Sequence, residues 1–91
     1  MKESAFEKRV GMEVEKLGGV YLKLTGIKGI PDRIVLLPGG KVGFIELKAL
    51  GEKPRNIQKK WISQLKDLGF VSDWADNFEK AMRLIDDIQT S

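Results

Sequence analysis

The spacing of hydrophobic and polar residues predicts three helices and four strands. Apolar residues recur at every third or fourth position in three segments, which places them on one face of a helix. These predicted helices cover residues 5–17, 57–68 and 78–88. Shorter apolar runs, bounded by glycine, proline or polar residues, predict strands at 20–24, 33–37, 42–48 and 70–75. The predicted order is αβββαβα, which indicates an α/β fold with helices flanking a mixed sheet.

Capping and turn residues support these boundaries. Ser4 precedes the first helix, and Glu7 three residues later completes a capping-box pattern. Asn56 and Asn77 are the predicted caps of the second and third helices. The Pro38–Lys41 segment reads as a turn, so the strands on either side of it are expected to pair antiparallel.

Composition restricts the available chemistry. The chain has 91 residues, enough for a single domain (residues 1–91) with a modest core. It contains no cysteine and no histidine, which excludes thiolate zinc sites and histidine-based acid–base catalysis. A metal ion would therefore be held by oxygen atoms, which favours Mg²⁺, Mn²⁺ or Ca²⁺. The net charge of +3 permits a nucleic-acid partner without requiring one.

Membrane segments are not expected. No apolar run approaches the roughly 20 residues that a membrane helix needs. Residues Met1–Ser4 lack the apolar segment of a signal peptide. These features predict a cytoplasmic protein that does not associate with membranes.

Three charged residues lie within or beside apolar strands. Asp32 follows Pro31 at the start of one predicted strand, and Glu46 and Lys48 lie near the end of the next. Pairing through the intervening turn brings both acids to one end of the sheet, where two carboxylates repel each other unless a cation lies between them. Lys48 shares a face with Glu46 because side chains alternate along a strand. The pattern predicts a metal-dependent site that cleaves phosphodiester bonds.

The same spacing also fits a purely structural alternative. In that alternative Glu46 and Lys48 form an ion pair on an exposed strand edge, and Asp32 caps a turn after Pro31. The residues on their own leave both interpretations open.

A longer pattern extends from the first helix to the fourth strand. It consists of Gly18-Gly19, Lys23, Gly29-Ile30-Pro31-Asp32-Arg33, Leu37-Pro38-Gly39-Gly40, Phe44-Ile45-Glu46-Leu47-Lys48, Gln58, Trp61 and Leu68-Gly69-Phe70. In these residues the chain resembles the viral-type replication-repair nuclease (VRR-NUC) domain of the PD-(D/E)xK nuclease superfamily. The resemblance implies a restriction-endonuclease-like core with the same αβββαβα order. It also implies a bacterial protein, or a phage protein in the host cytoplasm.

The resemblance assigns roles to the three charged residues and to their neighbour Leu47. Asp32 and Glu46 would be the central metal ligands, and the Leu47 carbonyl would join them. Lys48 would be the catalytic lysine of the motif, and the implied metal is Mg²⁺ or Mn²⁺.

The resemblance also assigns roles to two further residues, and for each of them the sequence leaves a purely structural alternative open. Gln58 matches a glutamine that helps to shape the catalytic site, and the alternative is an ordinary surface residue of a helix. Glu7 matches a glutamate of the first helix that serves as a further metal ligand, with Glu3 as a weaker rival. The alternative for Glu7 is the capping-box partner of Ser4, and the sequence supports the two equally.

Basic residues around the motif are candidates for contacts with DNA phosphates, which position DNA without reading its sequence. The candidates are Lys23, Lys28, Arg33, Lys53 and Arg55. For any one of them, a solvated surface position is the alternative.

The leading functional hypothesis is an endonuclease for branched DNA such as a four-way junction. A homodimer would suit that substrate, because two-fold symmetry presents two active sites. This step is an analogy with resolvase-like members of the superfamily. A flap or nicking nuclease is the near alternative, and a non-catalytic DNA-binding module with the same fold is a more distant one.

Overall fold

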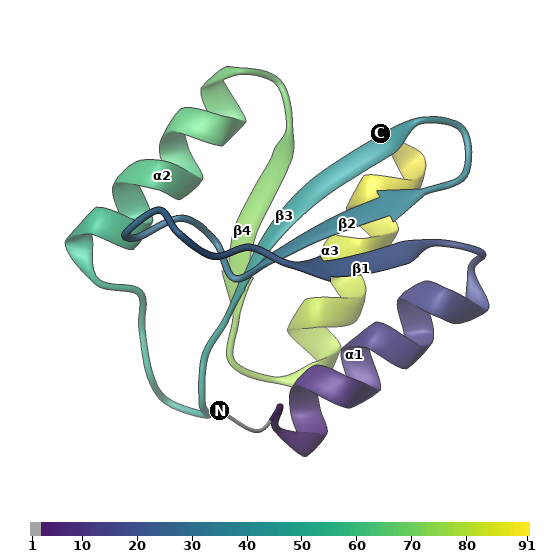
Figure 1. Ribbon diagram of the computed structural model, residues 1–91, viewed down its shortest axis with the longest axis horizontal. Coiled ribbons are helices and arrows are strands. Elements are labelled where there is room, and N and C mark those ends of the chain that lie inside the picture. The colour runs from purple at the N-terminus through teal and green to yellow at the C-terminus, as the bar shows by residue number, and fades with distance from the viewer. Residues whose placement is uncertain (1–2) are drawn as a thin grey trace.

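The computed structural model describes residues 3–91 and contains the predicted elements in the predicted order (Figure 1). The helices are α1 (Ala5–Lys16), α2 (Asn56–Asp67) and α3 (Phe78–Thr90). The strands are β1 (Val20–Lys23), β2 (Arg33–Leu37), β3 (Lys41–Leu47) and β4 (Val71–Ala75). The predicted α/β class with a mixed sheet is confirmed.

The sheet has the strand order β1-β2-β3-β4. The first three strands pair antiparallel, as predicted for β2 and β3, whereas β4 runs parallel to β3. Arg33 pairs with Ile45, so the residues just outside this pair, Asp32 and Glu46, meet at one end of the sheet. The register therefore brings the two acidic motif residues together.

One face of the sheet carries the hydrophobic core. Val35 and Ile45 on this face are fully buried beneath α1 and α3. Helix α3 packs closely over Gly43 on this face. A Cβ atom at this position would clash with the side chain of Ile88, so only glycine fits there. Side chains at alternate positions of each strand must then point to the opposite face.

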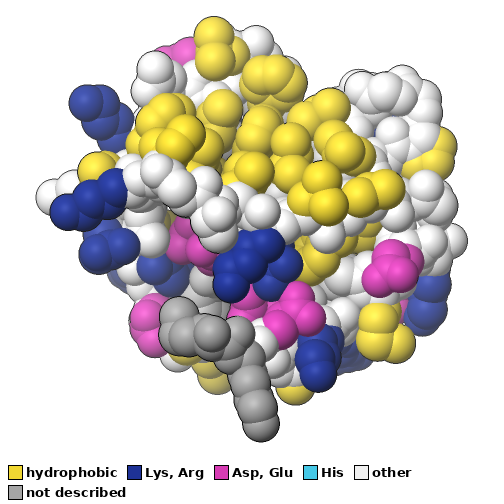
Figure 2. Space-filling view, viewed as in Figure 1, with side chains coloured by type: hydrophobic (Ala, Val, Ile, Leu, Met, Phe, Trp, Pro, Cys, Tyr) yellow, Lys and Arg dark blue, Asp and Glu magenta, His cyan; other side chains and the backbone are white. Residues whose placement is uncertain are grey.

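That opposite face is apolar and only partly covered. We call it the open sheet face, and it consists of Val20, Leu22, Ile34, Leu36, Val42 and Phe44. Figure 2 shows hydrophobic side chains gathered on this side of the molecule. Asp32 and Glu46 belong to the same alternating rows as Ile34 and Phe44. The acidic residues therefore lie at one end of the open sheet face.

Side-chain caps mark the starts of α1 and α3, as the sequence indicates. The Ser4 hydroxyl accepts a hydrogen bond from the Glu7 N–H at 3.1 Å, and the Glu7 carboxylate accepts one from the Ser4 N–H at 3.0 Å. Asn77 caps α3 by accepting from the Lys80 N–H at 2.9 Å. Both predicted caps are confirmed.

Two predictions for α2 are wrong. The cap is Arg55 rather than Asn56, because the side chain of Gln58 turns back and accepts a hydrogen bond from the Arg55 N–H at 2.8 Å. The spacing of apolar residues also predicts a buried face of Ile57, Trp61, Leu65 and Leu68, but Ile57 and Leu68 are exposed. Its buried residues are Gln58, Ile62 and Leu65. The helix is turned so that Gln58 reaches the sheet, which the hydrophobic pattern could not indicate.

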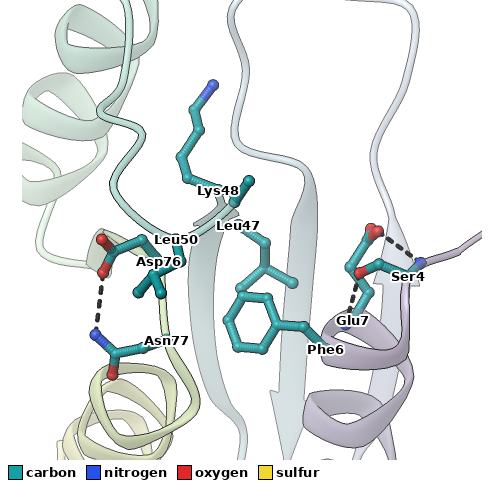
Figure 3. A pocket seen from close by; sticks show the side chains of 9 residues that line it. Ser4, Phe6, Glu7, Leu47, Lys48, Leu50, Asp76 and Asn77 are labelled. Atoms are coloured by element: carbon teal, nitrogen blue, oxygen red, sulfur yellow. Dashed lines mark hydrogen bonds between the residues drawn. The ribbon is translucent and has the colours of Figure 1, made fainter.

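A cavity of about 510 Å³ opens where β3 ends, between the first turns of α1 and α3 (Figure 3). We call it the β3-end cavity. Its lining includes Phe6, Glu7, Leu47, Lys48, Leu50 and Asp76. Within residues 3–91 no helix has the length and apolar character needed to span a membrane.

Candidate active site

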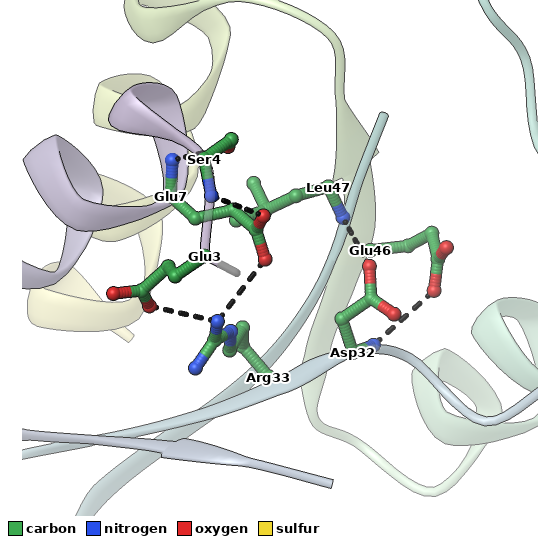
Figure 4. Close-up of polar contacts among 7 residues, drawn as sticks. All are labelled: Glu3, Ser4, Glu7, Asp32, Arg33, Glu46 and Leu47. Atoms are coloured by element: carbon green, nitrogen blue, oxygen red, sulfur yellow. Dashed lines mark hydrogen bonds and ion pairs between the residues drawn. The ribbon is translucent and has the colours of Figure 1, made fainter. Parts of the chain in front are cut away.

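Backbone hydrogen bonds fix Asp32 and Glu46 at the end of the sheet where β2 begins and β3 ends (Figure 4). The Asp32 N–H donates to Oε1 of Glu46 at 3.2 Å, and the Leu47 N–H donates to Oδ2 of Asp32 at 3.2 Å. Each strand thus supplies an N–H to the carboxylate of the other strand. Pro31, which is fully buried, and Gly29, whose φ is +84°, set the path of the chain into Asp32.

Glu46 is almost completely buried, with 2% of its surface exposed. Nε2 of Gln58 donates a hydrogen bond to Oε2 of Glu46 at 3.0 Å. Nζ of Lys48 lies 3.4 Å from the same oxygen. The structure therefore gathers Asp32, Glu46, Lys48 and Gln58 into one cluster. The surface alternative for Gln58 does not hold, because its side chain is buried.

The environment of Glu46 disfavours its charge. Burial raises the pKa of Glu46 to about 7, and the negative charge of Asp32 acts in the same direction, while Lys48 partly offsets both. The exposed-edge ion pair considered from the sequence also fails, because Glu46 is inside the protein. A buried carboxylate beside a second one is costly unless another positive charge binds there, so this site is suited to a cation.

Glu7 and Arg33 form a second cluster on the core side of β2. Nη2 of Arg33 donates to Glu3 at 2.8 Å and to Glu7 at 3.1 Å, and the guanidinium lies 4.7 Å from the ring centre of Tyr21. Partial burial opposes ionisation of Glu7, but hydrogen bonds from Ser4 and Arg33 prevail and lower its pKa. The capping-box alternative for Glu7 is therefore the one the structure shows.

These contacts bear on two sequence-based assignments. Arg33 is 6% exposed and committed to two carboxylates, so the predicted contact with DNA phosphate does not fit it. Within residues 3–91 no three acidic side chains converge closely enough to hold a metal ion together. Among these residues Glu7 is thus not grouped with Asp32 and Glu46, and its role as a further metal ligand stays a prediction.

Comparison with known proteins now gives the family. No protein-family model matches the chain. A solved structure described as "VRR_NUC domain" superposes with a TM-score of 0.80 at 30% sequence identity, over 89% of this chain and 90% of that one. The chain belongs to the VRR-NUC family. It is also 44% identical over 71 residues to "Putative nuclease p44" of Acyrthosiphon pisum secondary endosymbiont phage 1, covering 76% of each chain.

Four of the five basic candidates in this VRR-NUC protein remain on the surface. They are Lys23, Lys28, Lys53 and Arg55. Lys23 lies opposite Arg33 in the β1–β2 register, and Lys53 and Arg55 follow Lys48 in the loop before α2. Among the described residues none of the four forms an ion pair, so their charges face solvent at the same end of the sheet as the acidic pair.

The sequence motifs did not indicate the two residues on the far wall of the β3-end cavity as part of a site. Asp76 and Asn77 line that cavity opposite Glu7. Oδ2 of Asp76 also accepts a hydrogen bond from the Gly51 N–H at 3.1 Å, which anchors the loop after Lys48. The sequence does contain one indication of this role, because both residues directly follow the predicted fourth strand. Residues that follow the carboxyl end of a strand in a partly parallel sheet often face a binding site.

The raised pKa of Glu46 makes the stability of this VRR-NUC protein depend on pH. Folded Glu46 retains its proton up to about pH 7, whereas in the unfolded chain it loses it near its usual value of 4.5. The folded state therefore binds more protons between these values, and the free energy of unfolding falls as pH rises from 4.5 to 7. In EDTA the free energy of unfolding of the wild type should therefore fall by roughly 2 kcal/mol more than that of Glu46→Gln over this pH range. Urea unfolding at pH 5 and pH 8 measures the difference, and parallel behaviour of the two proteins would contradict it.

Proposed function

We propose that this VRR-NUC protein is a divalent-metal-dependent DNA endonuclease that acts on branched DNA. The observation that carries the proposal is the close pair of Glu46, which is buried, and Asp32, which is partly buried, contacted by Lys48 and Gln58 in a chain of the VRR-NUC family. A similar phage protein carries a name that describes it as a nuclease. A non-catalytic binding module would have no need to hold a buried carboxylate beside a second one.

The donor atoms of the site suit Mg²⁺ or Mn²⁺. Asp32 and Glu46 would hold the ion with their carboxylates, and the carbonyl of Leu47 would join them. Only oxygen atoms are offered, which is the preference of these ions. Because two carboxylates are brought together rather than three, water and a DNA phosphate would complete the coordination, as is usual for Mg²⁺. Such an ion, when bound, polarises the phosphate and lowers the pKa of water.

The protein groups have separable roles in this proposal. The N–H groups of Asp32 and Leu47 hold the carboxylates of Glu46 and Asp32 in fixed orientations. Gln58 holds Glu46 from the side of α2. The ammonium group of Lys48 lies at the same carboxylate, where it can orient the attacking water or stabilise charge that develops on the phosphate.

The exposed basic residues would hold the DNA backbone across this end of the sheet. Lys23 and Lys28 lie on one side, and Lys53 and Arg55 lie in the loop that follows Lys48. Such contacts act on phosphates and carry no sequence information, which is consistent with recognition of DNA shape.

We propose that the open sheet face mediates a two-fold homodimer. The side chains of Val20 and Leu22 on β1 are about half exposed there, and Ile34 and Phe44 continue this uncharged surface across β2 and β3. An apolar, uncharged surface is unsuited to DNA, and a second copy of the same surface is its simplest complement. The two active sites would then lie at the margins of one interface, which suits a symmetric four-way junction.

Substitution of Leu22 tests the homodimer. Leu22→Lys places a charge on a half-exposed position of the open sheet face, so we expect the dimer to dissociate to monomers at micromolar concentration. Leu68→Lys is the matched control, because Leu68 is exposed at the end of α2 and lies outside this face. Light scattering coupled to size-exclusion chromatography gives the mass. A monomeric wild type, or a dimer in both variants, would show that the open sheet face is not the interface.

The substrate proposal is tested with a panel of labelled DNAs. Wild-type protein with Mn²⁺ is expected to cut a four-way junction faster than a flap, a nicked duplex, single-stranded DNA or plain duplex. A preference for the flap or the nick would replace the junction with the alternative substrate. Binding without cutting on every member of the panel would favour the binding module.

A further inference from the structure

The β3-end cavity combines an aromatic floor with a polar rim. Phe6 is half-buried in the first turn of α1, and Figure 3 shows its ring reaching beneath Leu47 toward the opposite wall. Leu50 forms part of the loop wall and is 82% exposed. The volume of about 510 Å³ lies within the range of roughly 300–1,000 Å³ that is typical of small-ligand sites.

The charges around the cavity are unsuited to a phosphate group. Glu7 and Asp76 place carboxylates on opposite sides of it. The one cation in the lining, Lys48, directs its ammonium away from the floor toward Glu46. Both carboxylates already accept hydrogen bonds within the protein, and their negative charge disfavours a phosphate in the cavity. An uncharged group with an apolar face and N–H donors, such as a nucleobase, suits the aromatic floor and the polar rim.

The cavity adjoins the proposed catalytic groups directly. Leu47 and Lys48 belong both to its lining and to the end of β3, where the Leu47 N–H contacts Asp32 and Lys48 contacts Glu46. The cavity and the acidic pair therefore share Leu47 and Lys48 at the end of β3, and a nucleotide bound at the acidic pair would lie next to the cavity.

We propose that the β3-end cavity binds one unpaired nucleobase adjacent to the phosphodiester that is cut, stacked on Phe6. The inference rests on the proposed nuclease function and specifies its substrate. A paired base must first leave its duplex, which costs energy, whereas a base that is already unpaired at a branch enters without that cost. The cavity would therefore select branched DNA in which the nucleotide beside the cleavage position is unpaired or, at a four-way junction, belongs to a base pair that opens at the branch point.

The test compares DNA forks that differ in one base. Two forks carry either a normal nucleotide or an abasic residue as the unpaired nucleotide at the branch, and binding is measured by fluorescence anisotropy in EDTA, where no cutting is expected. Since stacking on an aromatic side chain contributes about 1–3 kcal/mol per base, the wild type should bind the abasic fork about 5- to 100-fold more weakly. Equal affinity of the wild type for the two forks would overturn the proposal.

Two variants connect this base effect to the cavity. Phe6→Leu retains apolar volume but removes the aromatic face, and should lose most of the preference for the base-bearing fork. Because Phe6 also packs against the core, Leu50→Glu provides a second variant at an exposed position and should lose the same preference. Leu68→Glu, at an exposed position outside the cavity lining, is the control and should keep it. A preference that persists unchanged in both cavity variants would also overturn the proposal.

The outcome is separable from the nuclease proposal. Cutting in Mn²⁺ without any base effect on binding would overturn the nucleobase site alone. A base effect that depends on Phe6 and Leu50, in a protein that cuts nothing, would support the nucleobase site and overturn the nuclease.

Discussion

Glu46→Gln is expected to abolish metal-dependent cleavage of DNA, with a loss of at least about a thousand-fold. The amide keeps the shape of the side chain and can still bond to Gln58, but it loses the negative charge that would hold the cation with Asp32. DNA binding should be retained, because the substitution removes a negative charge that repels phosphate. Single-turnover cleavage and anisotropy on the same labelled junction measure the two properties.

The control for this variant is Glu52→Gln, which changes an exposed glutamate in the loop after Lys48. It should cleave at the wild-type rate. Glu46→Gln should in addition be at least as stable as the wild type at pH 8 in EDTA, because it removes a buried charge. Substantial cleavage by Glu46→Gln would show that Glu46 is not a metal ligand, and unfolding of the variant would show that the buried carboxylate is structural.

Lys48→Met should separate catalysis from metal binding. Methionine retains the length and much of the volume of the side chain but removes the ammonium at Glu46. Loss of one charged group that stabilises the transition state typically costs about 10²–10³ in rate, and we expect a fall of that size. Mn²⁺ should still bind, since both carboxylates remain and the competing cation is gone. Cleavage rates and calorimetric titration with Mn²⁺ measure the two effects.

Lys66→Met is the matched control, because Lys66 lies near the end of α2 and pairs with Asp73, outside the catalytic cluster. It should alter neither cleavage nor Mn²⁺ binding. If Lys48→Met loses Mn²⁺ binding as well as cleavage, the lysine has a structural role in assembling the site. Full activity of Lys48→Met would remove Lys48 from the mechanism.

Local sequence signals were sufficient for the elements and for the central pair. Helical spacing, the Ser4 cap and the Pro38–Lys41 turn each describe interactions within a few residues, and the structure has the elements where they indicate. The antiparallel pairing through that turn also brings Asp32 to Glu46, as expected. These features depend on short-range geometry, which a sequence specifies directly.

The features that local sequence signals did not indicate share a different cause. The sequence presents Arg33 as a surface cation like its basic neighbours. Strand alternation instead places its side chain on the core side, where it pairs with the carboxylates of Glu3 and Glu7 near the start of α1. The family resemblance places Gln58 at the site, but the spacing of apolar residues does not show that its side chain is buried against Glu46 and that α2 docks by this face. Both outcomes depend on where a distant element packs, and hydrophobic periodicity does not contain that information. The β3-end cavity likewise arises only when three separate segments converge.

The most direct test of the central claim is a cleavage assay on a labelled four-way junction with wild-type protein in Mg²⁺, in Mn²⁺ and in EDTA. We expect strand cutting in at least one of the two metals and none in EDTA, because Glu46 and its partly buried neighbour Asp32, where β3 ends and β2 begins, would hold the ion. Cutting that continues in EDTA, or no cutting in either metal, would contradict the assignment of this site to metal-dependent DNA cleavage.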